Sequence, residues 1–251
     1  MSAVEYAHDG AVARLHLNRP ERLNAVVPAL TDALLAGFEA AARDGARAIV
    51  LAGRGRAFCA GHDLKEPEPV EDDAQARARL QRLQEVTRRI RDFPGIVVAS
   101  VHGYALGAGC EFALGCDLVV AAEDARFGFP EVGVGLSVTG GISALLPAVV
   151  GPMRAKELFA LGEPITAAQA AELGLVNRVT APGEHETVAL ELARRCAEQP
   201  PVALALAKQV IDRGMSRTVD EMLDREVDNA MLTRASGEAA GGRDRFAHRS
   251  S

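Results

Sequence analysis

The chain has 251 residues, of which 48% are hydrophobic and 25% charged, and its formal net charge is −6. These proportions are typical of a soluble globular protein, and the negative charge argues against non-specific binding to nucleic acid. No apolar run reaches the roughly 18 to 20 residues of a membrane span, and the opening residues lack the pattern of a secretory signal. The four cysteines, Cys59, Cys110, Cys116 and Cys196, form no CxxC pair. We therefore expect a cytoplasmic protein with reduced thiols, no bound metal, and neither membrane nor nucleic-acid partners.

The first half of the chain alternates segments with the patterns of strands and helices. Apolar runs predict strands at residues 11–20, 46–53, 95–103 and 116–129. Helical patterns predict helices at residues 27–45, at 74–93, and after the glycines at 107 and 109. The Pro-rich, acidic residues 66–73 between two of these elements predict a surface loop. This alternation favours a layered α/β fold with mostly parallel strands.

The last quarter of the chain has a different pattern. From about residue 187 onward, the spacing of apolar residues predicts helices only. We therefore divide the chain into an α/β core, residues 1–186, and a C-terminal helical region, residues 187–251.

One carboxylate stands out because its surroundings in the sequence are apolar. Glu111 lies within "GYALGAGCEFALGCDLVV", where its neighbours at i−4, i+3 and i+4 are Gly107, Leu114 and Gly115. A carboxylate is almost never fully buried without a partner, because removing its charge from water is costly. One interpretation is an amphipathic helix with Glu111 facing water. The other is an acid held in a dry pocket with a raised pKa, which prepares it for proton transfer.

Two glycine-rich turns can present unpaired backbone N–H groups. In "RAFCAGHDLKE", the small residues Ala60 and Gly61 allow a ligand to approach the backbone and leave the N–H of His62 unpaired. In "GYALGAGCE", the glycines lead into a helix whose first N–H groups have no partner within it. Two such donors that converge on one point would stabilise the oxyanion formed from a carbonyl group. Each turn alone is equally compatible with a tight turn and nothing more.

A second acid follows 20 positions after the first. Glu131 lies directly after Pro130 in "ARFGFPEVGVGL", and the proline restricts the turn that aims it. Two carboxylates in one pocket can hold a water molecule between them, with one acting as base and the other as acid. Taken by itself, Glu131 also fits a solvated loop.

Several segments together resemble the crotonase, or enoyl-CoA hydratase/isomerase, superfamily. The matching segments are "LNRPERLNA" (17–25), "AFCAGHDLKE" (57–66), "VHGYALGAGCEFALGCDLVVA" (101–121), "ARFGFPEVGVGL" (125–136) and "AAELGLVNRV" (171–179). They cover nearly the whole chain in the family's order. The resemblance implies a spiral of ββα turns with a C-terminal helical trimerisation region, assembled as a homotrimer or homohexamer.

The resemblance also assigns roles to individual residues. The family's oxyanion donors fall on the backbone N–H groups of His62 and Ala108, and its two catalytic acids fall on Glu111 and Glu131. It further implies a substrate or coenzyme A contact at Ala60, Asp63, Leu64, Lys65, Gly107 and Phe246. Lys65 is expected near the phosphates of coenzyme A. The expected reaction is hydration of a trans-2-enoyl-CoA to a 3-hydroxyacyl-CoA, with no cofactor beyond the coenzyme A of the substrate.

Some features depart from this family or leave alternatives open. The segment "LSVTGGISALL", residues 136–146, replaces the family's Pro-Gly-Ala-Gly-Gly-Thr-Gln-Arg-Leu, so the acyl preference is open. Ala108 replaces the usual glycine, and its amide can still donate. The same site would also serve an isomerase, a thioester hydrolase or a decarboxylase. A non-catalytic acyl-CoA or RNA binder is a further alternative, although the predicted first helix has no lysine and only Arg43. A catalytic His62 imidazole or a cysteine nucleophile would need a partner that the sequence does not place.

Overall fold

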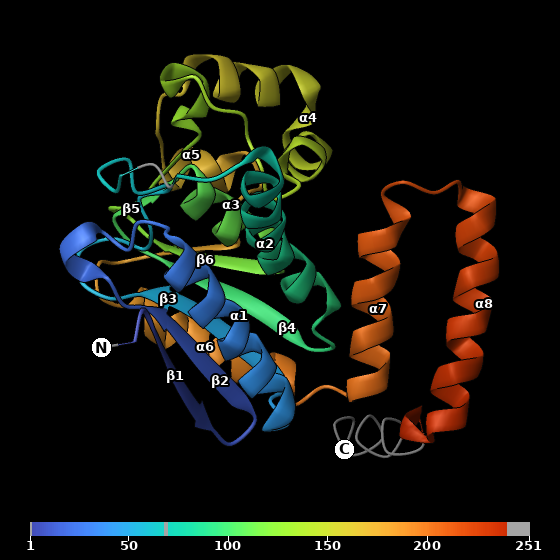
Figure 1. Ribbon diagram of the computed structural model, residues 1–251. Coiled ribbons are helices and arrows are strands. Elements are labelled where there is room, and N and C mark those ends of the chain that lie inside the picture. Colours follow the sequence, from blue (N-terminus) through green and yellow to red (C-terminus); the bar gives the residue numbers. More distant parts are fainter. Residues whose placement is uncertain (1, 68–69, 240–251) are drawn as a thin grey trace.

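The computed structural model describes residues 2–67 and 70–239, and it shows a layered α/β fold (Figure 1). The main sheet has the strand order β1-β2-β3-β4-β6-β9. Its strands are β1 (Val4–Asp9), β2 (Val12–Leu17), β3 (Ala48–Gly53), β4 (Ile96–Val101), β6 (Leu118–Ala122) and β9 (Arg178–Thr180). The hairpin of β1 and β2 is antiparallel, and every other pairing in this sheet is parallel. The predicted mostly parallel α/β fold is therefore confirmed.

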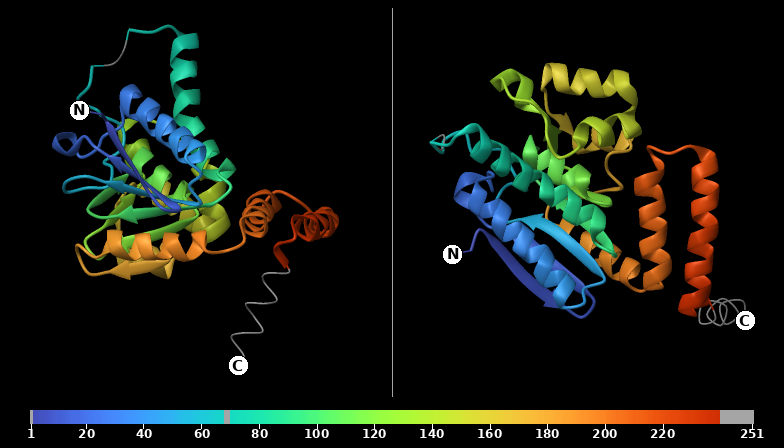
Figure 2. Two further views of the ribbon diagram at one scale, coloured as in Figure 1. Left: turned by 90° about the horizontal axis from the view of Figure 1, so that it is seen from below. Right: turned by 45° about the vertical axis from the view of Figure 1, so that its right-hand side comes forward.

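Both faces of the central strands β3, β4 and β6 are covered, which explains why these strands are apolar almost throughout. On one face, Ile49 and Leu51 of β3 belong to a large core shared with α1 (Pro28–Arg43), α2 (Asp73–Asp92) and α3 (Ala108–Gly115). On the other face, Ala48 and Val50 pack with buried alanines of α6 (His185–Ala197). Figure 2 shows α6 on the side of the sheet opposite α1 and α2. Strands buried on both faces have continuous hydrophobic runs instead of an alternating pattern.

A second, three-stranded sheet corrects one of the predicted strands. It consists of β5 (Tyr104–Leu106), β7 (Arg126–Gly128) and β8 (Ile165–Thr166). The predicted strand at 116–129 is in fact β6 and β7, which lie in different sheets on either side of a turn at residues 123–124. The predicted strand at 95–103 is confirmed as β4, and β5 follows it as a separate, unpredicted strand. This second sheet carries the chain into the two segments that hold the predicted acids.

The remaining elements surround the upper part of the sheet or extend beyond it (Figure 1). They are η1 (Pro20–Arg22), η2 (Pro130–Val134), α4 (Ile142–Leu161), α5 (Ala167–Glu172), α7 (Pro201–Gly214) and α8 (Val219–Ser236). Figures 1 and 2 show α7 and α8 as an antiparallel pair beside the main body, whereas α6 packs against the sheet. The division at residues 186 and 187 stays a prediction. In the ranges that the structure describes, no helix is long and apolar enough to cross a membrane.

Candidate active site

The two glycine-rich turns lie directly against each other. Gly61, whose φ is +88°, approaches the second turn so closely that an added Cβ would lie 2.7 Å from the Leu106 carbonyl oxygen. An added Cβ at Gly109 would meet the Cys59 carbonyl oxygen at 2.2 Å. Backbone hydrogen bonds between Cys59 and the strand β5 join the two turns. Glycine is therefore required at both positions, because any side chain would separate the turns.

The N–H of His62 is available because of how the backbone on either side of it pairs with Val26. His62 forms a parallel bridge with Val26, in which Val26 donates to the Gly61 carbonyl and Asp63 donates to the Val26 carbonyl. This pattern uses the groups on either side of His62 and directs its own N–H away from Val26. Within the described ranges, no acceptor takes a hydrogen bond from the His62 N–H.

The second donor is the first residue of a helix. Ala108 begins α3, and Gly107 before it has φ +51° and ψ −126°, a conformation that favours glycine. The N–H of Ala108 has no acceptor among the described residues, as expected for the first turn of a helix. The helix dipole adds a partial positive charge at this end. The two predicted oxyanion donors therefore lie on adjoining turns, and their catalytic role stays a prediction.

The segment before α1 fixes the turn that carries His62. Arg22 forms a two-pronged contact with Asp63, with distances of 3.1 Å from Nε to Oδ2 and 2.7 Å from the terminal nitrogen to Oδ1. Arg19 also donates to Asp63, at 3.2 Å. Asn24 is completely buried with φ +56°, and its side-chain amide donates to the Ala57 carbonyl at 2.8 Å. The Asp63 carboxylate, predicted to contact substrate or coenzyme A, is thus directed toward Arg19 and Arg22 and stabilises the turn.

Glu111 is buried in the first turn of α3, so the interpretation in which it faces water is wrong. Its residue exposure is 1%, and its carboxylate accepts two hydrogen bonds from Thr139. The Thr139 backbone N–H donates to Oε1 at 2.5 Å, and the Thr139 hydroxyl donates to Oε2 at 2.6 Å. Burial raises the pKa of Glu111, and the Thr139 hydroxyl and amide offset part of this rise.

Glu131 is also buried, which excludes the solvated-loop interpretation. Pro130 begins the short helix η2, and Glu131 follows it with an exposure of 8%. Its Oε1 lies where an added Cβ on Gly107 would be only 2.8 Å away, so Glu131 lies against the second turn. Its Oε2 is buried and has no hydrogen-bond partner within the described residues. Burial raises the pKa of Glu131, its own backbone N–H lowers it in part, and the neighbouring charge of Glu111 raises it.

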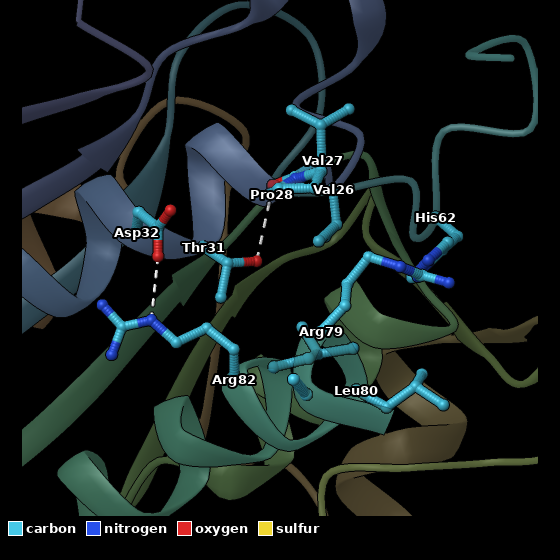
Figure 3. A pocket seen from close by; sticks show the side chains of 11 residues that line it. Val26, Val27, Pro28, Thr31, Asp32, His62, Arg79, Leu80 and Arg82 are labelled. Atoms are coloured by element: carbon cyan, nitrogen blue, oxygen red, sulfur yellow. Dashed lines mark hydrogen bonds and ion pairs between the residues drawn. The ribbon is translucent and has the colours of Figure 1, made fainter. Parts of the chain in front are cut away.

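A cavity of about 390 Å³ adjoins the first turn (Figure 3). It lies between the start of α1 and the N-terminal half of α2, and its lining is mainly apolar, with His62 at one side. Figure 3 shows the ion pair between Asp32 and Arg82 on one wall and the His62 ring near Arg79. Arg79 itself pairs with Glu71. The lining contains neither Glu111 nor Glu131, so this cavity can hold only part of a ligand that also reaches the carboxylates.

The other predicted contacts have varied environments. Leu64 is 68% exposed, Lys65 is exposed, and Ala60 is partly buried, which leaves all three accessible to a ligand. Their contacts with substrate or coenzyme A stay predictions. Phe246 lies outside the described residues.

The side-chain alternatives receive little support from the geometry. Cys59 and Cys110 are fully buried, and burial raises the pKa of the Cys59 thiol to about 12. Burial lowers the pKa of the His62 imidazole, and the nearby Arg79 lowers it further. Within the described ranges, no group of three or more His, Cys, Asp or Glu side chains could hold a metal ion.

The sequence did not reveal two residues that are distant along the chain but form direct hydrogen bonds within the site. Thr139 lies 28 positions from Glu111. Asn24 lies 33 positions from the Ala57 carbonyl that it bonds. Asn24 lies in a segment that matches the crotonase pattern, and Thr139 lies in the segment that departs from it. Nothing else in the sequence marked either residue.

The parallel sheet, the two adjoining turns and the C-terminal helices together define the crotonase type of α/β fold. The sequence model of the enoyl-CoA hydratase/isomerase family matches residues 7–251, and the chain belongs to this family.

Three similar proteins illustrate the range of this family. The chain is 41% identical over 212 residues to the 2,3-dehydroadipyl-CoA hydratase of Escherichia coli, covering 84% of this chain and 82% of that one. It is 36% identical over 231 residues to the 1,2-epoxyphenylacetyl-CoA isomerase of Escherichia coli, covering 90% and 88%. The enoyl-CoA hydratase structure from Geobacillus kaustophilus superposes with a TM-score of 0.91 at 36% identity, covering 98% of this chain and 95% of that one.

Proposed function

We propose that the protein hydrates a trans-2-enoyl-CoA thioester to the 3-hydroxyacyl-CoA. The observation that carries this proposal is the presence of two buried carboxyl groups, Glu111 and Glu131, beside two backbone N–H groups that have no acceptor among the residues that the structure describes. An oxyanion hole alone would serve several reactions of a thioester. Two neighbouring acids add the means to take one proton and supply another.

In the proposed reaction, the N–H groups of His62 and Ala108 bond the thioester oxygen and stabilise the negative charge that develops on it. Glu111 takes a proton from water as the water oxygen forms a bond to C3. The electrons of the double bond move toward the thioester, and C2 receives a proton from Glu131. One water molecule has then been added, and transfer of the proton from Glu111 to Glu131 restores the starting state.

The environments of the two acids support this division of roles. Glu111 accepts two hydrogen bonds, which favour its ionised form. Glu131 has an unpartnered buried oxygen and lies near the charge of Glu111, and both conditions favour its protonated form. In the proposal, Glu111 is therefore the ionised member of the pair before water adds, and Glu131 is the protonated member.

The thioester substrate would bind along the accessible side of the first glycine-rich turn. Lys65 would contact the phosphates of coenzyme A, and the cavity beside His62 would hold a further part of the thioester. We also infer a homotrimer or homohexamer. Large apolar side chains on α8 support this inference, because Val219, Leu223 and Val227 are more than half exposed at helical spacing.

An isomerase acting on the same class of thioester is the second candidate. Its support is the 36% identical relative named 1,2-epoxyphenylacetyl-CoA isomerase, together with the altered segment at residues 136–146. An isomerase would need only one of the two acids to move a proton.

Incubation with crotonyl-CoA, longer enoyl-CoAs and aromatic enoyl-CoAs in ¹⁸O-labelled water tests the proposal. We expect loss of the conjugated enoyl-thioester absorbance and one ¹⁸O atom in the product, detected by mass spectrometry. A product of unchanged mass would contradict hydration and favour isomerisation. Release of free coenzyme A would instead indicate a hydrolase, and binding without any reaction would indicate a non-catalytic acyl-CoA binder.

A further inference from the structure

The segment that contacts Glu111 is the one at which this chain departs from the family pattern. Gly140 has φ +60°, and an added Cβ there would lie 2.9 Å from Glu111 Cβ. The segment is therefore packed directly on the acid. From α2, the hydroxyl of Thr87 donates to the Gly140 carbonyl at 3.0 Å and holds the backbone in place.

Thr139 contacts both oxygens of the Glu111 carboxylate. The backbone N–H bonds Oε1 and the hydroxyl bonds Oε2, at 2.5 and 2.6 Å. Any residue except proline would supply the backbone N–H at position 139. Only serine or threonine would supply a hydroxyl at the same place. A hydrogen bond to an ionised carboxylate is roughly twice as strong as one between neutral groups, so the hydroxyl favours the ionised form of Glu111.

The hydrogen-bond donors that stabilise the ionised form of Glu111 are neutral groups. Besides burial, the charge of Glu111 raises the pKa of two nearby groups, the Glu131 carboxyl on η2 and the Cys110 thiol on its own helix. Within the described ranges, no cationic side chain contributes to the pKa shift of Glu111, whose causes are burial and Thr139. Among the residues with described positions, none donates to the buried Oε2 of Glu131.

We propose that Thr139 is a positioning residue that makes Glu111, and not Glu131, the ionised member of the pair and fixes the direction of its carboxylate. This inference rests on the proposed hydration, in which Glu111 acts as the base. Each oxygen of Glu111 accepts one bond from Thr139, so each retains a lone pair for water. The segment whose sequence departs from the family pattern thus contacts the first acid directly.

The substitution Thr139→Val tests this role, because valine has nearly the shape of threonine and keeps the backbone N–H. We expect kcat for crotonyl-CoA to fall by about 10- to 100-fold near neutral pH, the scale of a hydrogen bond to a charged group. KM should change little, and the acidic limb of the pH profile of kcat should move to higher pH. Thr139→Ser should restore most of the activity and the original limb.

Thr87→Val is the matched control, because it removes the other hydroxyl that holds the same segment without contacting Glu111. It should lower thermal stability slightly and leave the acidic limb where it is. If Thr87→Val moves the limb as far as Thr139→Val does, Thr139 acts only through the fold of the segment and the proposal is wrong.

A direct titration separates this proposal from the proposed reaction. The Glu111 carboxyl resonance in ¹³C-glutamate-labelled full-length protein, assigned with Glu111→Gln, should titrate at higher pH in Thr139→Val than in wild type or Thr87→Val. An unchanged titration overturns the role of Thr139 even if the enzyme hydrates enoyl-CoA. A shifted titration in a protein that hydrates no enoyl-CoA supports the control of Glu111 and rejects hydration.

Discussion

Glu111 and Asp117 lie at opposite ends of α3, and they show how one kind of side chain comes to serve two purposes. Burial raises the pKa of both. Asp117, just beyond the helix, accepts hydrogen bonds from the Lys208 ammonium at 2.8 Å and from the Val97 N–H at 2.7 Å. Glu111, in the first turn, accepts hydrogen bonds from the neutral N–H and hydroxyl of Thr139 and from no other group in the described part of the chain. A cation beside a buried carboxylate keeps it ionised in a structural contact, here called an anchor. Neutral donors leave the carboxylate able to exchange a proton.

The anchor at Asp117 joins distant parts of the chain. Lys208, on α7, also donates to the carbonyl of Ile90 at 2.7 Å and to that of Gly95 at 3.1 Å. All three ammonium protons therefore have acceptors. This buried contact attaches α7 to α2 and to the start of β4, at the far end of the helix whose beginning holds the candidate active site.

Glu131→Gln should produce the largest loss of catalytic rate among these variants. Glutamine has nearly the same shape but cannot deliver a proton, so we expect kcat to fall by about 10²- to 10⁴-fold. KM should change much less, and the melting temperature should stay close to that of wild type. Steady-state kinetics with an enoyl-CoA and a thermal melt measure these effects. A fall of less than tenfold would remove Glu131 from the reaction.

Lys208→Met should produce the largest loss of stability. It would leave the mostly buried Asp117 carboxylate without its cation, which costs about 3–5 kcal/mol of unfolding free energy. Urea denaturation measures this loss. Arg154→Ala is the control, because it breaks an exposed pair with Glu157 and should cost less than about 1 kcal/mol. Equal effects of the two variants would mean that Lys208 and Asp117 do not anchor the helix.

Asp63→Asn tests whether a cation-paired acid acts as an anchor even beside the active site. Burial opposes ionisation of Asp63, but hydrogen bonds from Arg22, the Lys65 N–H and Arg19 outweigh it and hold its pKa below the ordinary value. Asp63 thus stabilises the fold above the pKa of the unfolded chain, and this contribution is lost as pH falls through the lower folded pKa.

We expect Asp63→Asn to cost about 1–3 kcal/mol of unfolding free energy at neutral pH. Its kcat should fall by roughly tenfold, less than the about 10²- to 10³-fold cost of losing an oxyanion donor. Urea unfolding and kinetics on one preparation measure both quantities. A kcat loss without loss of stability would indicate direct contact of Asp63 with the substrate.

Glu111→Gln should change the unfolding free energy less than Lys208→Met or Asp63→Asn does, and it should increase it. Because burial raises the folded pKa of Glu111 above that of the unfolded chain, ionising it costs folding free energy as pH rises through these values. Glutamine carries no charge, so the variant should gain stability relative to wild type as pH rises from about 4, near the ordinary pKa of glutamate, toward neutral pH. Unfolding free energies at both ends of this range measure this gain, and a gain that shrinks with rising pH would contradict the direction of the pKa shift.

The elements of the main sheet could be predicted where burial leaves a clear pattern. Residues 46–53 and 95–103 are apolar because both faces of the sheet are covered, and they contain β3 and β4. The edge strand β1 was not predicted, because Glu5, His8 and Asp9 are exposed and conceal its pairing with β2. The division of 116–129 was missed because the intervening turn has no glycine or proline.

The candidate site could be predicted only in part for a similar reason. Glu111 stood out because its neighbours in the sequence are apolar, and the glycines marked both turns. The contacts that separate its role from that of Asp117 join residues 28 and 91 positions apart. Such pairs depend on how the segment before α4, and α7 itself, pack against the core, and neither residue type nor spacing specifies that packing.

A side-by-side measurement of Glu111→Gln and Asp117→Asn tests the comparison most directly. Both changes remove one buried charge from an end of α3 and keep the shape of the side chain. We predict that Glu111→Gln loses at least a hundredfold in enoyl-CoA hydration and unfolds at the same or a higher urea concentration than wild type. Asp117→Asn should keep its hydration rate within a few-fold and lose about 3 kcal/mol of unfolding free energy. An active Glu111→Gln, or an inactive but fully stable Asp117→Asn, would contradict the assignment of catalysis to one end of the helix and anchoring to the other.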